Sequence, residues 1–215
     1  MKQILLMITV VALVGCGKKE NGNTGVVNPN KPSPKAVPEK LIADPIVQKA
    51  IGFQLDKPAG ELAKADLEQV TELNLADYQL TEIPTGLERL TQLKWLNLFN
   101  NQLTSVMGLE KLTQLKELGL HYNKLTDVKG LEKLTQLTEL TLDGNKLTDV
   151  KGLEKLTQLK KLSLGDTQLT NVKGLEKLAK LEELYLQDNP DLTKAQIAEL
   201  KKALPKCNII SNPTK

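Results

Sequence analysis

A leucine that recurs every 22 residues through the middle of the chain is the feature that most limits its fold. The recurring positions are Leu93, Leu115, Leu137, Leu159 and Leu181. Within one unit, Leu118 and Leu120 alternate with polar residues, as in a short strand. Further along the same unit, Val128, Leu131 and Leu134 are three residues apart, as in a helical or 3-10 segment. We therefore predict that each unit is a strand, a turn and a return arm.

A single unit of this kind cannot fold alone, because it buries too few apolar side chains to offset the conformational entropy that it loses. Stacked units cover one another's leucines and complete a parallel ladder of strands. A looser copy begins at Val70, so we predict six units over residues 70–192. The leucines at both ends of such a stack require caps.

Three tandem copies of the pattern L-x-x-L-x-L-x-x-N-x-L resemble the leucine-rich repeat. They run from Leu93 to Leu103, from Leu115 to Leu125 and from Leu137 to Leu147. The 22-residue length and the return arm LTDVKGLEKLTQL are similar to the internalin-type class of bacterial leucine-rich repeats. The resemblance implies an α/β fold: a curved solenoid with a parallel sheet inside, irregular or 3-10 return arms outside, and helical caps at both ends.

Asparagines recur where each unit turns inward, and we predict that their buried amides satisfy backbone groups that the strand ladder does not reach. These residues are Asn101, Asn123, Asn145 and Asn189. Tyr78 and Thr167 occupy the same column in the first and fifth copies. Because a hydroxyl offers fewer hydrogen bonds than an amide, replacing Thr167 by asparagine is expected to stabilise the fold.

The first 15 residues have the features of a secretory signal peptide. A basic residue, Lys2, precedes an apolar run that is too short to span a bilayer. The following Leu13-Val14-Gly15-Cys16 resembles the bacterial lipobox, which implies cleavage before Cys16 and lipidation of its thiol. Since Gly17 is not aspartate, the resemblance also implies sorting to the outer membrane where one exists. The alternative is an ordinary cleaved signal peptide with a cysteine nearby.

Residues 16–40 are expected to be a disordered tether, because they are rich in glycine, asparagine, proline and lysine and poor in large apolar residues. The whole chain has a net charge of +3, but from residue 41 onward 23 basic residues face 24 acidic ones. The basic excess therefore lies beside the predicted anchor. A nearly neutral solenoid gives no reason to expect a nucleic-acid partner.

Helical signals flank the repeats. In residues 41–69, Asp44-Pro45 opens one predicted helix with an apolar face, and a second runs over residues 64–69. In residues 193–215, Thr193 is expected to cap a helix through Leu204, followed by a last strand from Cys207 to Ile210. With Cys16 lipidated, Cys207 has no partner for a disulfide. We interpret Cys207 as a buried structural thiol, the alternative being a reactive or dimer-forming one.

Residues beside the second and third leucines of each unit are expected to point away from the core, onto the concave face of the sheet. Five of the six aromatic residues lie in or beside these positions, namely Tyr78, Trp95, Phe99, Tyr122 and Tyr185. We hypothesise that this face binds a ligand through Trp95, Asn97, Phe99, Glu117, His121, Tyr122 and Tyr185. The alternative is that the aromatic residues only pack together or against the N-terminal cap.

Glutamate-lysine pairs recur on the return arms, as at 132–133 and 154–155, together with Lys129, Lys151 and Lys173. We interpret this repetition as a solvated outer surface of mixed charge. The alternative is electrostatic contact with anionic lipid or a cell-wall polymer.

An enzyme is not predicted. His121, Asp143 and Ser163 fall on successive strands, but a catalytic triad needs the imidazole between the other two groups, and here the carboxylate is central. One histidine with scattered Asp143, Asp166 and Asp188 does not form a metal-ligand set, so no metal or cofactor is predicted.

The sequence therefore predicts a monomeric, lipid-anchored, extracytoplasmic scaffold of a bacterial envelope that binds another protein without catalysis. Two alternatives remain open at this point. One is a glycan or cell-wall ligand that stacks on Trp95 and Tyr122. The other is a structural envelope component without a specific ligand. The fold does not decide among them.

Overall fold

The structure of the 215-residue chain is a computed structural model that describes residues 41–57 and 62–213. The predicted signal peptide, Cys16 and tether lie outside the described residues. The described residues belong to one folded unit, which begins near residue 39. No helix in the described ranges is long and apolar enough to cross a membrane.

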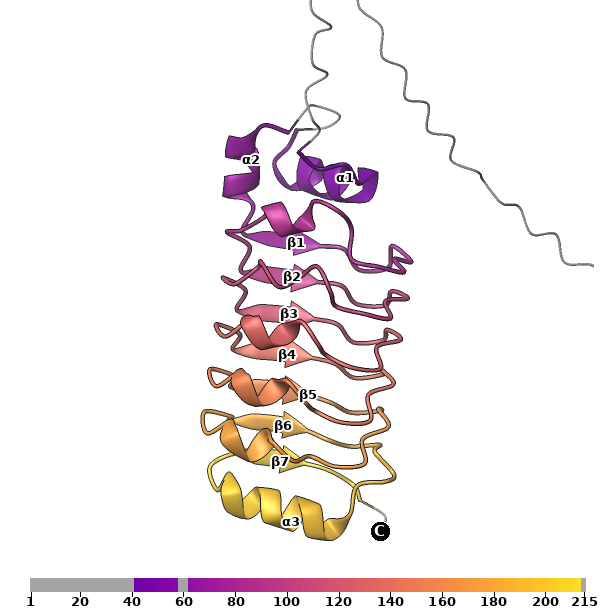
Figure 1. Cartoon of the computed structure of the whole chain (residues 1–215), viewed down its shortest axis with the longest axis vertical. Coiled ribbons are helices and arrows are strands. Elements are labelled where there is room, and N and C mark those ends of the chain that lie inside the picture. The colour runs from indigo at the N-terminus through magenta and orange to yellow at the C-terminus, as the bar shows by residue number, and fades with distance from the viewer. Residues whose placement is uncertain (1–40, 58–61, 214–215) are drawn as a thin grey trace, which may run out of the picture. The chain divides into compact units, whose positions relative to one another are not determined.

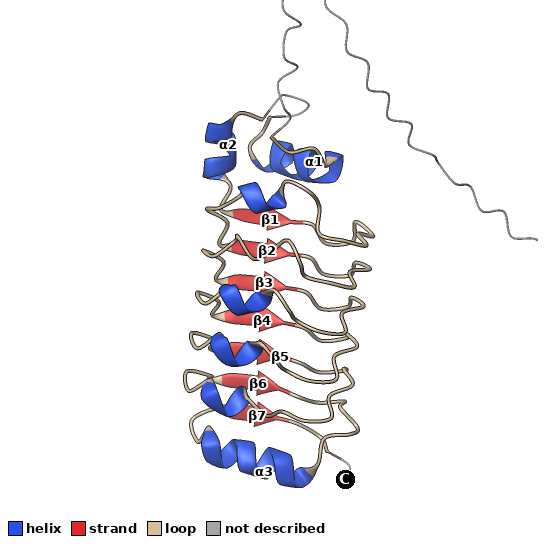
Figure 2. Cartoon of the chain, viewed as in Figure 1, coloured by secondary structure: helices blue, strands red, loops and turns tan. Residues whose placement is uncertain are grey.

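Seven parallel strands, paired in chain order, form one sheet (Figures 1 and 2). The strands are β1 (Glu72–Asn74), β2 (Trp95–Asn97), β3 (Glu117–Gly119), β4 (Glu139–Thr141), β5 (Lys161–Ser163), β6 (Glu183–Tyr185) and β7 (Asn208–Ile210). Each of the first six has one buried leucine between two more accessible residues. Neighbouring strands pair without slippage, so Leu96, Leu118 and Leu140 lie opposite one another. The predicted parallel solenoid is confirmed.

Most of the return arms contain a short 3-10 turn, which is one of the two forms that the three-residue spacing predicted. They are η1 (Leu87–Arg89), η2 (Leu131–Lys133), η3 (Leu153–Lys155) and η4 (Leu175–Lys177), and they stack in one column in Figure 2. A glycine with positive φ precedes each turn, for example Gly152 with φ 98°. Such a backbone conformation favours glycine because it has no Cβ.

The core consists of leucine columns enclosed between the sheet and the return arms. Leu96 and Leu98 of the second unit have no exposed surface, and neither do Leu131 and Leu134 of a return arm. The registers of neighbouring units match, so each leucine is covered by its counterparts above and below. This burial removes apolar surface from water along the whole stack.

Two helices lie beyond β1 and one lies beyond β7 (Figure 1). The first, α1 (Pro45–Gln54), is capped by Asp44, whose carboxylate accepts from the backbone N–H groups of Ile46 and Val47. The second is α2 (Lys64–Gln69). The third, α3 (Lys194–Ala203), begins with the capping box of Thr193 and Gln196.

Some predicted details of the caps were wrong. The apolar face predicted for α1 does pack against the core, with Val47 and Ile51 buried and Ile46, Ala50 and Leu55 partly buried. Strand β7 begins at Asn208 rather than Cys207. Cys207 is free and half-buried rather than fully buried, because it precedes the last strand at the end of the stack. Its surroundings still raise the pKa of the thiol, chiefly through burial and also through Glu183.

The asparagine column lies buried at the end of the strands. Each Oδ1 of the four asparagines accepts from a leucine N–H in the preceding unit, and each Nδ2 donates to two leucine carbonyls. Asn145, for example, accepts from Leu125 and donates to Leu120 and Leu142. Thr167 is also buried, but its hydroxyl reaches only the Leu164 carbonyl and the Asn189 side chain.

Candidate functional site

The exposed side of the sheet, here called the strand face, carries three rows of side chains. The first row is Glu72, Trp95, Glu117, Glu139, Lys161 and Glu183, and the second is Asn74, Asn97, Gly119, Thr141, Ser163 and Tyr185. The third row follows the strands and contains Ala76, Phe99, His121, Asp143, Gly165 and Gln187. All seven predicted ligand-binding residues except Tyr122 belong to these rows, and Tyr122 directly follows His121.

Three of the predicted site residues pack together and form what we call the aromatic cluster: Phe99, His121 and Tyr122. The rings of Phe99 and His121 are stacked, with centroids 4.4 Å apart and planes at 26°. Tyr122 meets Phe99 and His121 edge to face, at centroid distances of 5.8 and 6.0 Å. Tyr122 is 54% exposed, whereas the other two rings are half-buried. The cluster therefore offers a preassembled aromatic surface to solvent.

The remaining predicted aromatics do not join this cluster. Trp95 is half-buried on β2 and makes no ring contact with another aromatic side chain in the part of the chain that the structure describes. Tyr185 lies four strands further along the sheet and donates its hydroxyl to Glu183 at 2.9 Å. This hydrogen bond to a carboxylate raises the pKa of Tyr185. The strand face therefore has an aromatic half near β2 and β3 and a more polar half.

Tyr122 owes its position to an unusual backbone conformation. Its φ is 55°, in the left-handed region that side chains other than asparagine and aspartate seldom adopt. The same column of turns holds Asn100, Asp166 and Asp188, also with positive φ. A Cβ added to Gly144 on the next unit would lie 2.5 Å from Cδ1 of Tyr122. The tyrosine ring thus occupies space that only a glycine leaves free, a dependence that the sequence pattern did not predict.

His121 is held in place by its neighbours on both sides. Its Nδ1 lies 3.1 Å from the Thr141 hydroxyl on β4, while its ring stacks on Phe99. Burial lowers the pKa of His121, and the nearby Asp143 carboxylate partly opposes this shift. The imidazole is therefore neutral at neutral pH and acts as an aromatic surface.

Asn97 and Gly119 shape the middle of this half. Oδ1 of Asn97 accepts from the Phe99 N–H at 3.0 Å, so the amide supports the backbone under the aromatic cluster. On the neighbouring strand, Gly119 presents no side chain, and a Cβ there would lie 3.0 Å from the same oxygen. The Thr141 hydroxyl would lie 3.7 Å from this Cβ on the other side, so the neighbouring side chains close over Gly119 and leave little room for a larger residue.

Glu117 is the exposed carboxylate of this region. The strand register places it directly between Trp95 on β2 and Glu139 on β4. Glu139 is bound by Lys161, with Oε1 and Nζ 3.0 Å apart. This contact raises the pKa of Lys161, through the hydrogen bond and the charge of Glu139.

His121, Asp143 and Ser163 do not form a catalytic triad. The hydroxyl of Ser163 donates to Oδ1 of Asp143, and His121 contacts Thr141 instead of either residue. The serine hydroxyl therefore contacts the carboxylate and not the imidazole, whereas a catalytic triad needs the imidazole between the other two groups. Within residues 41–57 and 62–213, no group of three or more histidine, cysteine, aspartate or glutamate side chains is placed to hold a metal ion.

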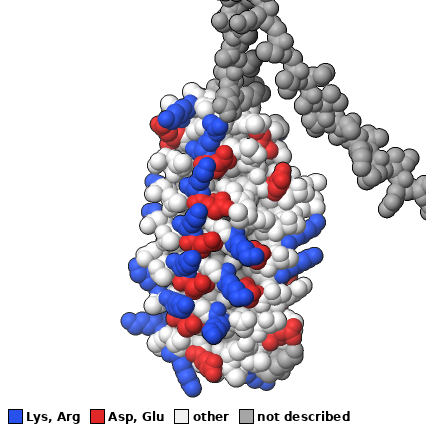
Figure 3. Space-filling model, in the orientation of Figure 1, with Lys and Arg blue, Asp and Glu red and all other residues white. Residues whose placement is uncertain are grey.

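Figure 3 shows basic and acidic side chains interleaved down the side of the molecule that faces the viewer. Sequence reasoning treated the return-arm glutamates only as part of a solvated surface and missed their structural contact. The carboxylates of Glu88, Glu110, Glu132, Glu154 and Glu176 each accept from the N–H of the glycine two residues earlier, at 2.6–2.8 Å. The repeated G-L-E in the sequence is the signal that could have revealed it.

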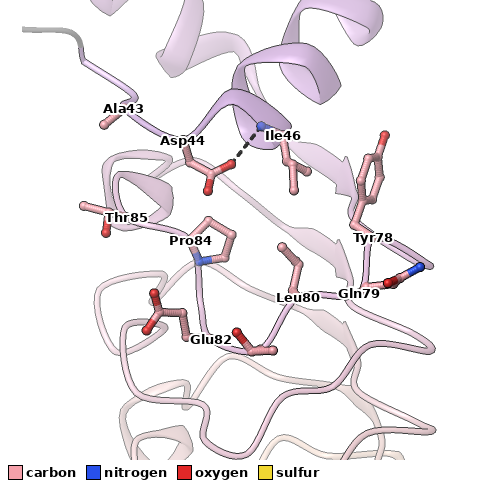
Figure 4. Close-up of a pocket in the computed structure, with 10 residues that line it drawn as sticks. Ala43, Asp44, Ile46, Tyr78, Gln79, Leu80, Glu82, Pro84 and Thr85 are labelled. Atoms are coloured by element: carbon pink, nitrogen blue, oxygen red, sulfur yellow. Dashed lines mark hydrogen bonds between the residues drawn. The ribbon is translucent and has the colours of Figure 1, made fainter.

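A pocket of about 430 Å³ lies between the start of α1 and the loop after β1 (Figure 4). Leu80 and Pro84 line it beneath Ile46, with Tyr78 at its side. The carboxylate of Asp44, also in its lining, is already used to cap α1. The pocket was not predicted, because its walls come from the cap and the first repeat together.

The chain belongs to the leucine-rich-repeat family. The family description "Leucine Rich repeats (2 copies)" matches residues 91–133, 113–155 and 157–202, which together make up more than half of the chain.

Solved bacterial proteins share this fold. An internalin of Listeria monocytogenes (inlF) has a TM-score of 0.63 and 25% identity, over 81% of this chain and 58% of its own. Internalin C2 of the same species has a TM-score of 0.63 and 26% identity, over 81% and 88%. A leucine-rich-repeat protein of Leptospira interrogans has a TM-score of 0.63 and 37% identity, over 67% and 38%. The chain thus spans little more than half of inlF. Among curated proteins, none matches it.

Proposed function

We propose that the chain is a non-enzymatic scaffold that captures another protein on its strand face. The observation that carries this proposal is the aromatic cluster beside Trp95, whose side chains are exposed or half-buried on a sheet built from well-packed leucines. Aromatic side chains on a rigid support are the groups that most often anchor protein interfaces. Their mutual packing also lowers the conformational entropy lost on binding.

We further propose that the chain is extracytoplasmic and held on the bacterial envelope by lipid on Cys16. The support is the signal-like start of the chain and the lipobox-like Leu13-Val14-Gly15-Cys16. The likeness to internalins of Listeria monocytogenes agrees with a protein that works outside the cytoplasm. The long segment between Cys16 and the folded unit would let the strand face reach a partner away from the lipid surface.

The test is affinity capture from the envelope of the source organism, with the full chain and a double variant, Trp95→Ala with Phe99→Ala. Capture of the partner is expected to fall at least about tenfold, because truncating aromatic anchors commonly costs 2 kcal/mol or more of binding free energy. The matched control is Phe53→Ala, which removes a 91% exposed aromatic residue of α1, away from the strand face. Circular dichroism of each variant checks that the fold is retained.

Each alternative predicts a different result in the same experiment. A glycan ligand would be released by soluble envelope oligosaccharides, whereas a bound protein would remain. A structural component without a specific ligand would show equal capture by the native chain and the double variant. Either result would contradict the proposed function.

A further inference from the structure

The strand face is more acidic than the folded unit as a whole. Its three rows carry five carboxylates, Glu72, Glu117, Glu139, Asp143 and Glu183, and one ammonium group, Lys161. From residue 41 onward the chain as a whole is nearly balanced, with 23 basic and 24 acidic residues. On the side of the molecule drawn in Figure 3, the two signs are interleaved. The strand face therefore attracts positive charge.

Glu117 carries one of the uncompensated negative charges of the strand face. Among the described residues no cation forms an ion pair with Glu117, and its opposite neighbour on β4 is another carboxylate, Glu139. Like charges directly opposite on adjacent strands destabilise a sheet. Lys161 approaches Glu139 from the far strand, β5, and leaves Glu117 unpaired. A cation supplied from outside would relieve this repulsion.

The surroundings of Glu117 suit the side chain of arginine or lysine. The indole of Trp95 lies on the other side of Glu117, and aromatic faces attract ammonium and guanidinium groups. A guanidinium group can also bind a carboxylate through two hydrogen bonds while its plane stacks on an aromatic ring.

We propose that the partner is a protein that docks a basic segment on the strand face, with an arginine or lysine side chain held by Glu117 and Glu139 beside Trp95. An apolar side chain of the same segment covers the aromatic cluster, whose exposed edge is Tyr122. This inference rests on the proposed function and adds the chemistry of the partner. The same negative charge would repel an anionic lipid or polymer from this face.

The test uses the full chain, solubilised in detergent and immobilised, to select peptides from a random library displayed on phage. The selected peptides are expected to contain arginine or lysine next to an apolar residue. Fluorescence anisotropy then measures the affinity of the best peptide for the native chain and for Glu117→Gln. A loss of at least about tenfold is expected, because the variant removes the charge that the basic side chain faces. Raising the salt concentration should weaken binding to the native chain more than to the variant.

The matched control is Glu199→Gln, which removes an exposed carboxylate of α3 outside the strand face and is expected to leave the affinity unchanged. Selected peptides that lack basic residues, or that bind Glu117→Gln as well as the native chain, would overturn the inference. If such peptides still lost affinity for Trp95→Ala, the proposed function would stand without its basic partner. If Trp95→Ala also bound unchanged, or if no peptide were enriched, both proposals would fail.

Discussion

At the scale of single residues, the buried asparagine column shows how polar side chains are accommodated inside a leucine core. The four asparagines are between 3% and 7% exposed, and each side-chain amide both accepts and donates hydrogen bonds, as Asn123 does. An unpaired buried backbone group would cost about 1–3 kcal/mol, so these hydrogen bonds fix where each unit turns. Thr167 is the one buried member of this column that is not an asparagine among residues 41–57 and 62–213.

Replacing Thr167 with asparagine is expected to stabilise the folded unit. An amide at this position could accept from one backbone N–H and donate to two carbonyls, as Asn145 does one unit earlier. One or two added hydrogen bonds contribute about 1 kcal/mol, which raises Tm by roughly 2–4 °C for a unit of this size. Thermal unfolding measures the change, and Thr126→Asn, at an exposed threonine, is the control. A Tm that stays equal or falls would count against the prediction.

Tyr122 illustrates a residue whose placement only the folded structure reveals. The repeat pattern aligns it with Asn100 and Asp188, which tolerate positive φ, and gives no reason for a tyrosine. The ring fits because Gly144 follows it in the next unit and Phe99 lies beside it. The backbone strain at Tyr122 falls at the candidate site, where strained residues often occur.

At the scale of elements, the return arm combines two local devices. A glycine with positive φ begins the turn, and the glutamate two residues later accepts its N–H, as Glu154 does from Gly152 at 2.6 Å. The Glu154 carboxylate interacts with the backbone N–H groups of Glu154 itself and of Gly152, and both interactions lower its pKa. The pKa of Glu132 is lowered in the same way, by its own backbone N–H and that of Gly130. The return arm is thus stabilised by ionised carboxylates.

Acid is therefore expected to lower the free energy of unfolding of the native chain more than that of a Glu154→Gln variant. Because folding lowers the pKa of Glu154, its stabilising contribution is complete above the unfolded pKa of about 4.3 and is lost as the pH falls through the lower folded value. A glutamine at this position can still accept the Gly152 N–H through its amide oxygen, and its side chain does not titrate in this pH range. Urea unfolding at neutral and acidic pH measures the free energy of unfolding of the native chain and of the variant. The difference between the two values should be smaller at acidic pH.

The control for this prediction is Glu68→Gln, which changes an exposed glutamate of α2. It should leave the acid dependence of the unfolding free energy as it is in the native chain. A constant difference between the native chain and Glu154→Gln at every pH would contradict the role assigned to this carboxylate.

At the scale of the whole molecule, the stack has two capped ends and one face that we propose binds a partner. Helix α1 buries Val47 and Ile51 at the β1 end, and α3 buries Ile197 and Leu200 at the β7 end. Terminal caps of this kind keep the outermost leucines from water. The proposed anchor, Cys16, precedes the first cap by a segment outside the described residues.

Cys16→Ser is expected to release the protein from the membrane fraction of its native host. Acyl chains contribute about 0.8 kcal/mol for each buried methylene, so losing them removes the main attachment to the bilayer. Cell fractionation followed by immunoblotting measures the distribution. Cys207→Ser, at the half-buried thiol of the C-terminal end, should remain with the membrane. A Cys16→Ser protein that still sediments with membranes would exclude the proposed lipid anchor.

Much of the fold was predictable because leucines at a fixed period can be buried only in one way. The alternation around Leu118 and the three-residue spacing from Val128 determined the strand and the return arm, and both are confirmed. The candidate site was less predictable. The rows of the strand face followed from the register, but whether neighbouring side chains touch depends on their conformations. The sequence therefore did not show that Phe99, His121 and Tyr122 pack together while Trp95 stays apart.

The solenoid, its parallel register and the side of the sheet that each residue faces all follow from the sequence alone. The reason is that leucines at this period are buried together only when the units stack in register. The tertiary structure decided which side chains meet across units. It set Tyr122 over Gly144, paired Lys161 with Glu139 and turned the Glu154 carboxylate onto Gly152. These contacts join residues through space, and their geometry depends on backbone angles and side-chain packing that a one-dimensional pattern does not specify.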